Sequence, residues 1–329
     1  MRLNAHYFRQ HTYTIVPRQL REDLKWIADL GTDAITIGCL EQDLFAIQAN
    51  LDIIFGEAER AGLKVSVIPS RWGGFIAGAP KVPSIFTSKR PDTWILDRKG
   101  QPVCTDFGPI SSVHHPDTFE LFRKSLESLL SRWPVDCIIW DEPKALLLED
   151  HSEWARKFMP ADAGTDWHTG AFAAFFDRVG HYIHEHFPAV RIAMFLHGQH
   201  RESVVNCCAR ITHLDVFGLD ARPWSLSRDT PKDSGAESVR SLIDDAPRFF
   251  KAARENDHQT MMLLENHNMP HEEDIDLMDK RMPEILDLRP DFLHYYYYPR
   301  NVCDPERQME IISRHFRASD LGSQSASNV

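Results

Sequence analysis

The chain of 329 residues repeats one local pattern eight times: a short apolar run, a loop, and an amphipathic helix. The apolar runs, expected as strands, span residues 3–8, 34–37, 64–69, 136–140, 191–196, 213–219, 260–264 and 292–297. The expected helices span residues 17–30, 44–61, 117–133, 171–187, 202–208, 238–256, 272–286 and 305–316. In the first of them, Leu20, Leu24 and Ile27 recur at the spacing of a helix that buries one face.

Regular alternation of strand and helix predicts a parallel sheet covered by helices. With eight units such a sheet closes on itself, so the expected fold class is α/β, a (β/α)8 TIM barrel. An open, doubly wound sheet is the competing arrangement. It normally carries a glycine-rich turn after its first strand, and this sequence has none.

The segment after the third expected strand, residues 70–115, is much longer than an ordinary connection. Loops of this length in compact domains are usually functional, so we expect a lid or a wall for the substrate. No internal boundary divides the rest of the chain. We therefore expect a TIM-barrel catalytic domain over residues 1–317 and a flexible C-terminal tail over residues 318–329, where small polar residues predominate.

The net charge of −11 argues against nucleic acid and against an anionic membrane surface, because both require a basic face. Neutral ligands fit this charge most easily, although a local basic pocket is compatible with it. The N-terminal residues lack the pattern of a secretory signal, and no apolar run has the length of a membrane span. The six cysteines show no Cys-x-x-Cys spacing. We expect reduced thiols and a cytoplasmic protein.

In a barrel of this type the active site lies at the C-terminal ends of the strands, so the polar residues that follow each apolar run are the candidates. Two are acids that end apolar strands, Glu142 in Trp140-Asp141-Glu142-Pro143 and Glu265 in Leu264-Glu265-Asn266-His267. Burying an ionised carboxylate is costly unless the group is paired or used. Each acid alone is explained equally well by a helix cap or an arginine partner, but the two together favour catalysis.

The remaining candidates are aromatic, imidazole and polar groups suited to binding sugar hydroxyls and ring faces. They are His6, Tyr7, Arg71, Trp72, Trp140, Asp141, His197, Asp220, Asn266, His267 and Tyr297. In the run Tyr295-Tyr296-Tyr297-Tyr298, alternate side chains face opposite sides of the strand, and the sequence leaves open which pair enters the barrel mouth.

An acid before proline at the end of the fourth strand and a second acid at the end of the seventh resemble the retaining clan of barrel glycoside hydrolases. The resemblance implies that Glu142 is the acid/base, that Glu265 is the nucleophile, and that the substrate is a small carbohydrate. Asp141 stands where that clan has asparagine. We expect its charge to raise the proton affinity of Glu142, which suits a general acid.

Two alternatives use the same fold. One is a non-catalytic sugar-binding barrel. The other is a divalent-metal-dependent sugar isomerase, epimerase or lyase, whose ligands would come from His6, Asp141, Glu142, His197, Asp220, Glu265 and His267. No close-spaced ligand motif supports it, since His181, His184 and His186 fall on an expected outer helix. We therefore predict no metal and no cofactor, and leave the oligomeric state open.

Overall fold

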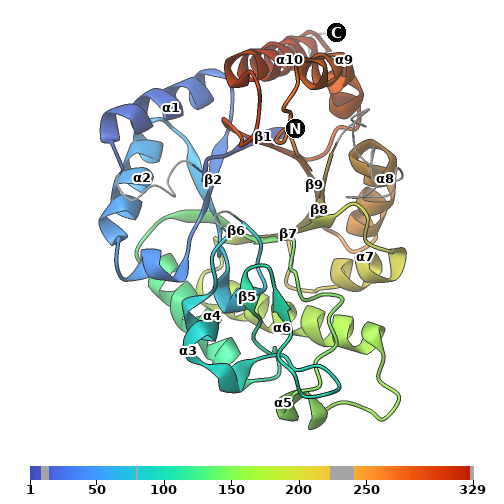
Figure 1. Ribbon diagram of the computed structural model, residues 1–329. Coiled ribbons are helices and arrows are strands. Elements are labelled where there is room, and N and C mark those ends of the chain that lie inside the picture. Colours follow the sequence, from blue (N-terminus) through green and yellow to red (C-terminus); the bar gives the residue numbers. More distant parts are fainter. Residues whose placement is uncertain (9–14, 79–80, 223–240, 327–329) are drawn as a thin grey trace.

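The computed structural model describes residues 1–8, 15–78, 81–222 and 241–326. Eight parallel strands form a closed barrel in the order β1-β10-β9-β8-β7-β6-β3-β2, so strands adjacent in sequence are adjacent in space (Figure 1). Their bounds are β1 Arg2–His6, β2 Ala34–Gly38, β3 Lys64–Ile68, β6 Val135–Asp141, β7 Arg191–His197, β8 Val216–Ala221, β9 Gln259–Leu264 and β10 Phe292–Tyr296. The predicted TIM barrel is confirmed.

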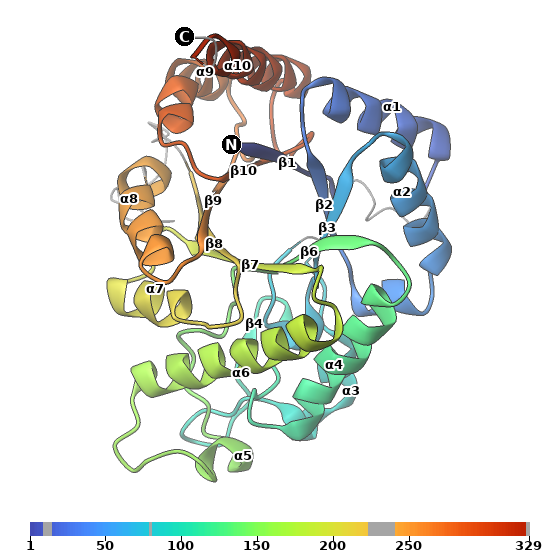
Figure 2. The same cartoon turned by 180° about the vertical axis from the view of Figure 1, so that it is seen from behind.

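Helices surround the barrel on its outer side, as the view from behind shows (Figure 2). The outer layer consists of α1 Pro17–Asp29, α2 Gln48–Arg60, α4 Pro116–Leu130, α6 Thr165–His186, α7 Glu202–Ala209, α8 Ser241–Arg254, α9 Glu272–Asp287 and α10 Pro305–Ala326. Each expected helix is present, apart from residues 238–240, which lie outside the described residues.

The three largest differences from the predicted boundaries are in helices. Helix α2 begins at Gln48 because residues 41–44 form a separate 3-10 turn, η2 Glu41–Leu44. Helix α6 begins at Thr165, six residues before the expected start, and so buries His168 and Thr169 in its first turns. Helix α10 continues to Ala326, into the segment predicted as a tail. The domain boundary at residue 317 stays a prediction.

The long segment after β3 folds back onto the end of β6. It contains η3 Trp72–Gly74, α3 Ile85–Lys89, η4 Pro91–Thr93 and a small antiparallel pair, β4 Cys104–Thr105 with β5 Gly108–Pro109. The amide of Ala77 donates to the Asp141 carbonyl (2.8 Å), and the amide of Lys144 donates to the Phe75 carbonyl (2.7 Å). Phe75 also stacks on Phe122 of α4, with ring centroids 5.2 Å apart. These contacts fix the segment as a wall beside the mouth of the barrel.

Close packing between neighbouring strands requires glycine at one position. A Cβ atom on Gly218 of β8 would lie 1.8 Å from the carbonyl oxygen of Met261 in β9. All six cysteines are free thiols. Among the described residues, no helix combines the length and apolarity that a membrane span needs.

Candidate active site

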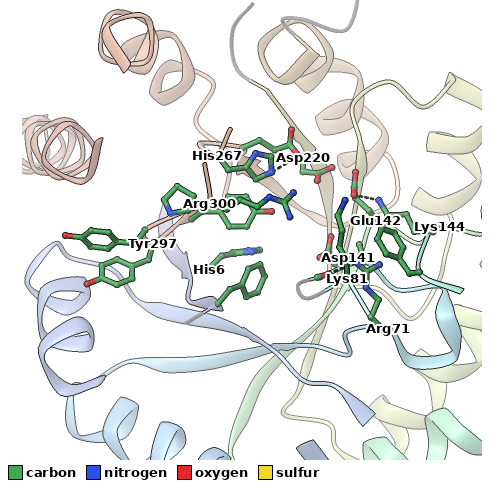
Figure 3. A pocket seen from close by; sticks show the side chains of 18 residues that line it. His6, Arg71, Lys81, Asp141, Glu142, Lys144, Asp220, His267, Tyr297 and Arg300 are labelled. Carbon is green, nitrogen blue, oxygen red and sulfur yellow. Dashed lines mark hydrogen bonds and ion pairs between the residues drawn. The ribbon is translucent and has the colours of Figure 1, made fainter. Parts of the chain in front are cut away.

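A cavity of about 460 Å³ lies at the C-terminal ends of the barrel strands. Strands β1, β6, β8 and β10, the residues after β9 and the long segment after β3 all contribute to it (Figure 3). Its lining residues are His6, Phe8, Arg71, Ala77, Gly78, Lys81, Phe107, Asp141, Glu142, Lys144, Asp220, Glu265, His267, Tyr296, Tyr297, Tyr298, Pro299 and Arg300. The structure therefore brings both predicted catalytic acids into one cavity.

Glu142 follows β6 in a left-handed backbone conformation, with φ of 34°, and its amide donates to the Phe195 carbonyl of β7 (3.1 Å). This conformation is costly for a residue with a Cβ and is typical of functional positions. The side chain forms an ion pair with Lys144, two residues further along the chain. It also shares a hydrogen bond with the Asp220 carboxyl group from β8.

The charge state of Glu142 differs from the prediction. Burial acts to raise its pKa, but the Lys144 ammonium, His197 and the hydrogen bond with Asp220 outweigh burial, so the pKa is lowered. The expected rise through Asp141 is therefore wrong. Sequence reasoning considered Asp141 but missed Lys144, whose opposite charge has the larger effect.

The other carboxyl groups in the cavity bind protons more tightly than usual. Burial, followed by the charge of Glu142, raises the pKa of Asp141 to about 7 and that of Glu265 to about 7. The same two causes raise the pKa of Asp220 well above its ordinary value. Carboxyl groups this close share protons and titrate as a set. Near neutral pH the cavity thus holds both ionised and protonated acids, which acid/base chemistry requires.

Imidazole and phenol rings surround the acids. His6 shares a hydrogen bond with His294 inside the barrel (Nε2 to Nδ1, 3.0 Å), and burial lowers the pKa of both rings, that of His294 to about 3. His267 Nε2 lies 3.7 Å from Glu265 Oε1, and its ring stacks on Tyr296. Burial lowers the pKa of His267 to about 4, so these rings are neutral hydrogen-bonding groups.

Among the described residues, the buried polar atoms at this cavity without a hydrogen-bond partner include His6 Nδ1, His267 Nδ1 and Asp220 Oδ1. Buried polar atoms are nearly always paired, so unpaired ones need an explanation. Their position in the cavity wall fits a hydroxyl-rich ligand that would supply the missing partners.

Eight of the predicted residues line the cavity, and the tryptophans do not. Those in the lining are His6, Arg71, Asp141, Glu142, Asp220, Glu265, His267 and Tyr297. Trp72 is fully buried against Phe122, and Trp140 packs against Phe122 and Phe176 on the helix side of β6. Both are core residues, which corrects their expected role in stacking on a sugar.

Tyr7, Asn266, Tyr297 and His197 also lie differently from the prediction. The hydroxyls of Tyr7 and Tyr297 both donate to Asp23 of α1 (2.8 and 2.9 Å). Tyr297 contributes to the cavity wall, but its ring points away from the cavity (Figure 3). Asn266 is fully buried and donates to the Tyr296 carbonyl (3.0 Å). His197 lies beside Glu142 without lining the cavity, and there it acts on the charge of that acid.

The predicted catalytic and binding set omitted several residues that line the cavity: Phe8, Lys81, Phe107, Lys144, Tyr296, Tyr298 and Arg300. Lys144 and Arg300 each follow a strand end by a few residues, and this position is the signal that identifies them. The structure also shows which tyrosines of the run 295–298 face the barrel mouth. Tyr296 and Tyr298 line the cavity, whereas the Tyr295 hydroxyl shares a hydrogen bond with the Thr32 hydroxyl.

Two groups of side chains in the described part of the chain have ligand atoms within 4.8 Å of one another, the spacing that a metal ion needs. The first is Asp141, Glu142 and Asp220, where the Lys144 ammonium already pairs with Glu142. Lys144 thus supplies positive charge at the place where a cation would bind.

The second group, Glu149, His151 and His168, lies outside the cavity. Arg98 pairs with Glu149 at 2.8 Å. His168 Nδ1 accepts the Asp150 amide (3.2 Å), which places the proton of a neutral ring on Nε2. Neither nitrogen of His168 then offers a lone pair, and we interpret this group as a hydrogen-bonded cluster.

No protein-family profile and no curated protein matches the sequence. Solved structures do match the fold. The chain aligns with a beta-galactosidase from the psychrophilic Marinomonas ef1 at a TM-score of 0.65 and 10% identity, over 99% of this chain and 60% of that one. A GH36 alpha-galactosidase from Geobacillus stearothermophilus gives a TM-score of 0.56 at 10% identity, over 96% of this chain and 41% of that one.

The catalytic domain of a beta-amylase from Paenibacillus polymyxa is closer in size. It aligns at a TM-score of 0.59 and 12% identity, over 95% of this chain and 97% of that one. The chain thus spans well under two thirds of either galactosidase but nearly all of the amylase domain. At such low identity, these matches establish the barrel fold.

Proposed function

We propose that the chain is a glycoside hydrolase that acts on small glycosides or oligosaccharides, with Glu142 and Glu265 as its catalytic pair. One observation carries the proposal: acids from the fourth and seventh barrel strands line a single cavity at the barrel mouth. These are the strand positions of the catalytic acids in the retaining clan that the sequence resembles. The likeness of the barrel to galactosidases and an amylase supports the same class.

In this proposal the reaction is a retaining double displacement. The ionised Glu265 attacks the anomeric carbon while Glu142 protonates the departing oxygen. Water then attacks the glycosyl-enzyme, and Glu142 accepts the proton of that water. Because the pKa of Glu265 is about 7, a substantial fraction of this group is ionised at neutral pH.

The proton on Glu142 needs a source, because Lys144 favours the ionised form of this acid. Asp220 fits this role: it shares a hydrogen bond with Glu142, and its own raised pKa keeps it protonated. As the departing oxygen gains negative charge, the proton would pass from Asp220 to Glu142 and then to that oxygen. Lys144 would stabilise the Glu142 anion that remains.

A panel of 4-nitrophenyl α- and β-glycosides tests this function by release of nitrophenol. We expect hydrolysis of at least one member, and proton NMR should show that the first sugar product keeps the anomeric configuration of the substrate. Inversion would rule out the double displacement and retain the hydrolase. No hydrolysis of any member, neutral or anionic, would contradict the proposal.

The cluster of Asp141, Glu142 and Asp220 is the observation that favours the second candidate, a divalent-metal-dependent sugar isomerase or lyase. Metal content of the purified protein and activity on free aldoses distinguish it from the hydrolase. A stoichiometric metal and an activity lost to a chelator and restored by Mg²⁺ or Mn²⁺ would favour the metal enzyme. Aryl glycoside hydrolysis that is unchanged by the chelator would exclude it.

A further inference from the structure

Most acids of the cavity and two of its cations come from different parts of the fold. The acids Asp141, Glu142 and Asp220 gather at the ends of β6 and β8 with Lys144 beside them. Two other cations, Lys81 and Arg300, come from outside the barrel strands, one from the long segment after β3 and one from the residues after β10. Figure 3 shows both extending into the cavity.

Phe107 connects the cations on one side of this cavity. The Arg71 guanidinium lies 3.9 Å from the centre of the Phe107 ring, and the Lys81 ammonium lies 5.4 Å from it. Arg71 is also fixed by a hydrogen bond from Nη2 to the Gly78 carbonyl (2.7 Å). Burial lowers the pKa of Arg71, Asp141 and Glu142 oppose this lowering, and the positive charge of Arg300 adds a smaller lowering. Cations from separate segments therefore act on one another across this space.

No carboxylate in the described part of the chain lies within ion-pair distance of Lys81 or Arg300. The nearby acids do not replace such a partner. Glu142 pairs with Lys144, and the raised pKa values of Asp141, Glu265 and Asp220 leave these groups largely or partly protonated near neutral pH. The cavity is thus locally basic within a chain whose net charge is −11.

We propose that the sugar bound in this cavity is anionic, and that its carboxylate, phosphate or sulfate group contacts Arg300 and Lys81. This inference rests on the proposed glycosidase function and names its substrate class. A guanidinium presents a planar pair of donors that matches the oxygens of such a group, and lysine adds a point charge. The anionic group would set the orientation of the sugar, with its anomeric carbon toward Glu142 and Glu265.

Paired substrates test the inference. The aryl glycosides would be matched sets that differ only in the acidic substituent: glucoside, glucuronide and glucoside 6-phosphate, galactoside, galacturonide and galactoside 6-sulfate. We expect kcat/KM for the best anionic member to exceed that of its neutral counterpart at least ~10-fold, with the gap narrowing in high salt. The member that wins identifies the acidic group. A neutral glycoside cleaved as well as or better than all anionic ones would overturn the inference and leave the hydrolase intact.

Variants locate the contact. Arg300→Gln should lower kcat/KM on the anionic glycoside at least ~10-fold more than on the neutral one. Both substrates lose the effect of Arg300 on the pKa of Glu265, but only the anionic one loses a charged contact. Lys81→Gln should act in the same direction with a smaller effect. Lys280→Gln removes an exposed charge from α9, outside the cavity, and serves as the control. Equal losses on both substrates would overturn the inference.

Direct binding separates this inference from the function on which it rests. Calorimetry with glucuronate, galacturonate and glucose 6-phosphate against glucose and galactose needs no turnover. Tighter binding of an anionic sugar without hydrolysis of any glycoside would support the inference and contradict the hydrolase. No preference for an anionic sugar in either binding or hydrolysis would overturn the inference.

Discussion

At the N-terminal end of the barrel, acidic side chains lie beside cations and backbone amides, whereas at the C-terminal end they lie beside one another. Asp136, at the start of β6, pairs with Lys64 (3.2 Å) and with Arg191. Asp215 likewise accepts the Ile192 amide (2.7 Å). At the other end of β6, carboxylate oxygens of Asp141, Glu142 and Asp220 gather within 4.8 Å.

Both ends contain a cavity, so the cavity alone does not distinguish them. The one at the N-terminal end is about 270 Å³ and is lined by Asp136, Arg191 and the starts of several strands. In it, Asp136 pairs with Lys64 and Arg191, and Asp33 accepts the Leu3 amide. At the mouth, the carboxyl pKa values of Asp141 and Asp220 are raised, and some buried polar atoms of the described residues lack a hydrogen-bond partner. These groups are held in surroundings that do not stabilise their charge. From this comparison we predict that the N-terminal acids serve stability and that the C-terminal acids serve the proposed chemistry.

The largest expected difference between the ends concerns activity. Glu265→Gln should lower kcat at least ~10³-fold, because the amide cannot form the glycosyl-enzyme. Initial rates on the best aryl glycoside measure this loss, and circular dichroism checks the fold. Asp136→Asn at the opposite end is the matched control and should retain kcat within ~2-fold. Similar losses in the two variants would remove the distinction between the ends.

The second prediction concerns the charge of Lys144 at the barrel mouth. Lys144→Met should lower kcat/KM roughly 10- to 100-fold, because removing the ammonium raises the pKa values of both Glu142 and Glu265. The limb of the pH profile that requires ionised Glu265 should then move to higher pH by about one unit. Lys144→Arg keeps the charge and should restore most of the wild-type profile. A lower rate with an unchanged profile would mean that Lys144 acts only in packing.

For stability, Asp136→Asn should be more damaging than Glu265→Gln, the reverse of their effects on activity. Asp136→Asn breaks ion pairs with two cations, and we expect a loss of about 1–3 kcal/mol in the free energy of unfolding, which allows for the partial exposure of the partners. Chemical denaturation at neutral pH measures this loss. No loss of stability in Asp136→Asn would contradict the structural role assigned to Asp136.

The smallest effect is a pH dependence of stability with opposite signs at the two ends. The folded-state pKa of Glu265, raised to about 7, means that this group stabilises the protein below its unfolded pKa and that the contribution disappears as pH rises through about 7. Glu265→Gln should therefore match the wild type at pH 5 and exceed its stability by about 1–3 kcal/mol at pH 8. Asp291 near the N-terminal end has a lowered pKa, so its contribution disappears as pH falls. Parallel pH curves for wild type and Glu265→Gln would refute the strained state of this acid.

The barrel fold could be predicted from the sequence alone because each of its strands is a separate apolar run. The positions of Glu142 and Glu265 could be predicted in the same way, since an acid that ends such a run lies at the barrel mouth. The misplaced residues share one cause. Successive side chains of a strand face opposite sides, so once His6 faces the interior its neighbour Tyr7 faces the helices.

The same alternation applies to other strand ends. Trp140 beside Asp141 and Tyr297 beside Tyr296 both face the helix side. Counted back from Asp141, this rule places Trp140 on the helix side, whereas Glu142, which follows the strand in a left-handed conformation, lines the cavity beside Asp141. The burial of Trp72 has a different cause. Trp72 belongs to the segment after β3, and this segment is held in place by contacts with β6 and α4. No local pattern encodes such contacts.

Covalent trapping tests whether acids from the fourth and seventh strands act together at the mouth. The protein would be incubated with the 2-deoxy-2-fluoro analogue of its best aryl glycoside, carrying a good leaving group, and digested for peptide mass spectrometry. We predict one fluoroglycosyl group per chain, attached to Glu265. With a second analogue, whose leaving group requires protonation, the adduct should accumulate faster in the wild type than in Glu142→Gln. A label on any other residue, or continued turnover of the parent glycoside without a trapped adduct, would contradict the assignment.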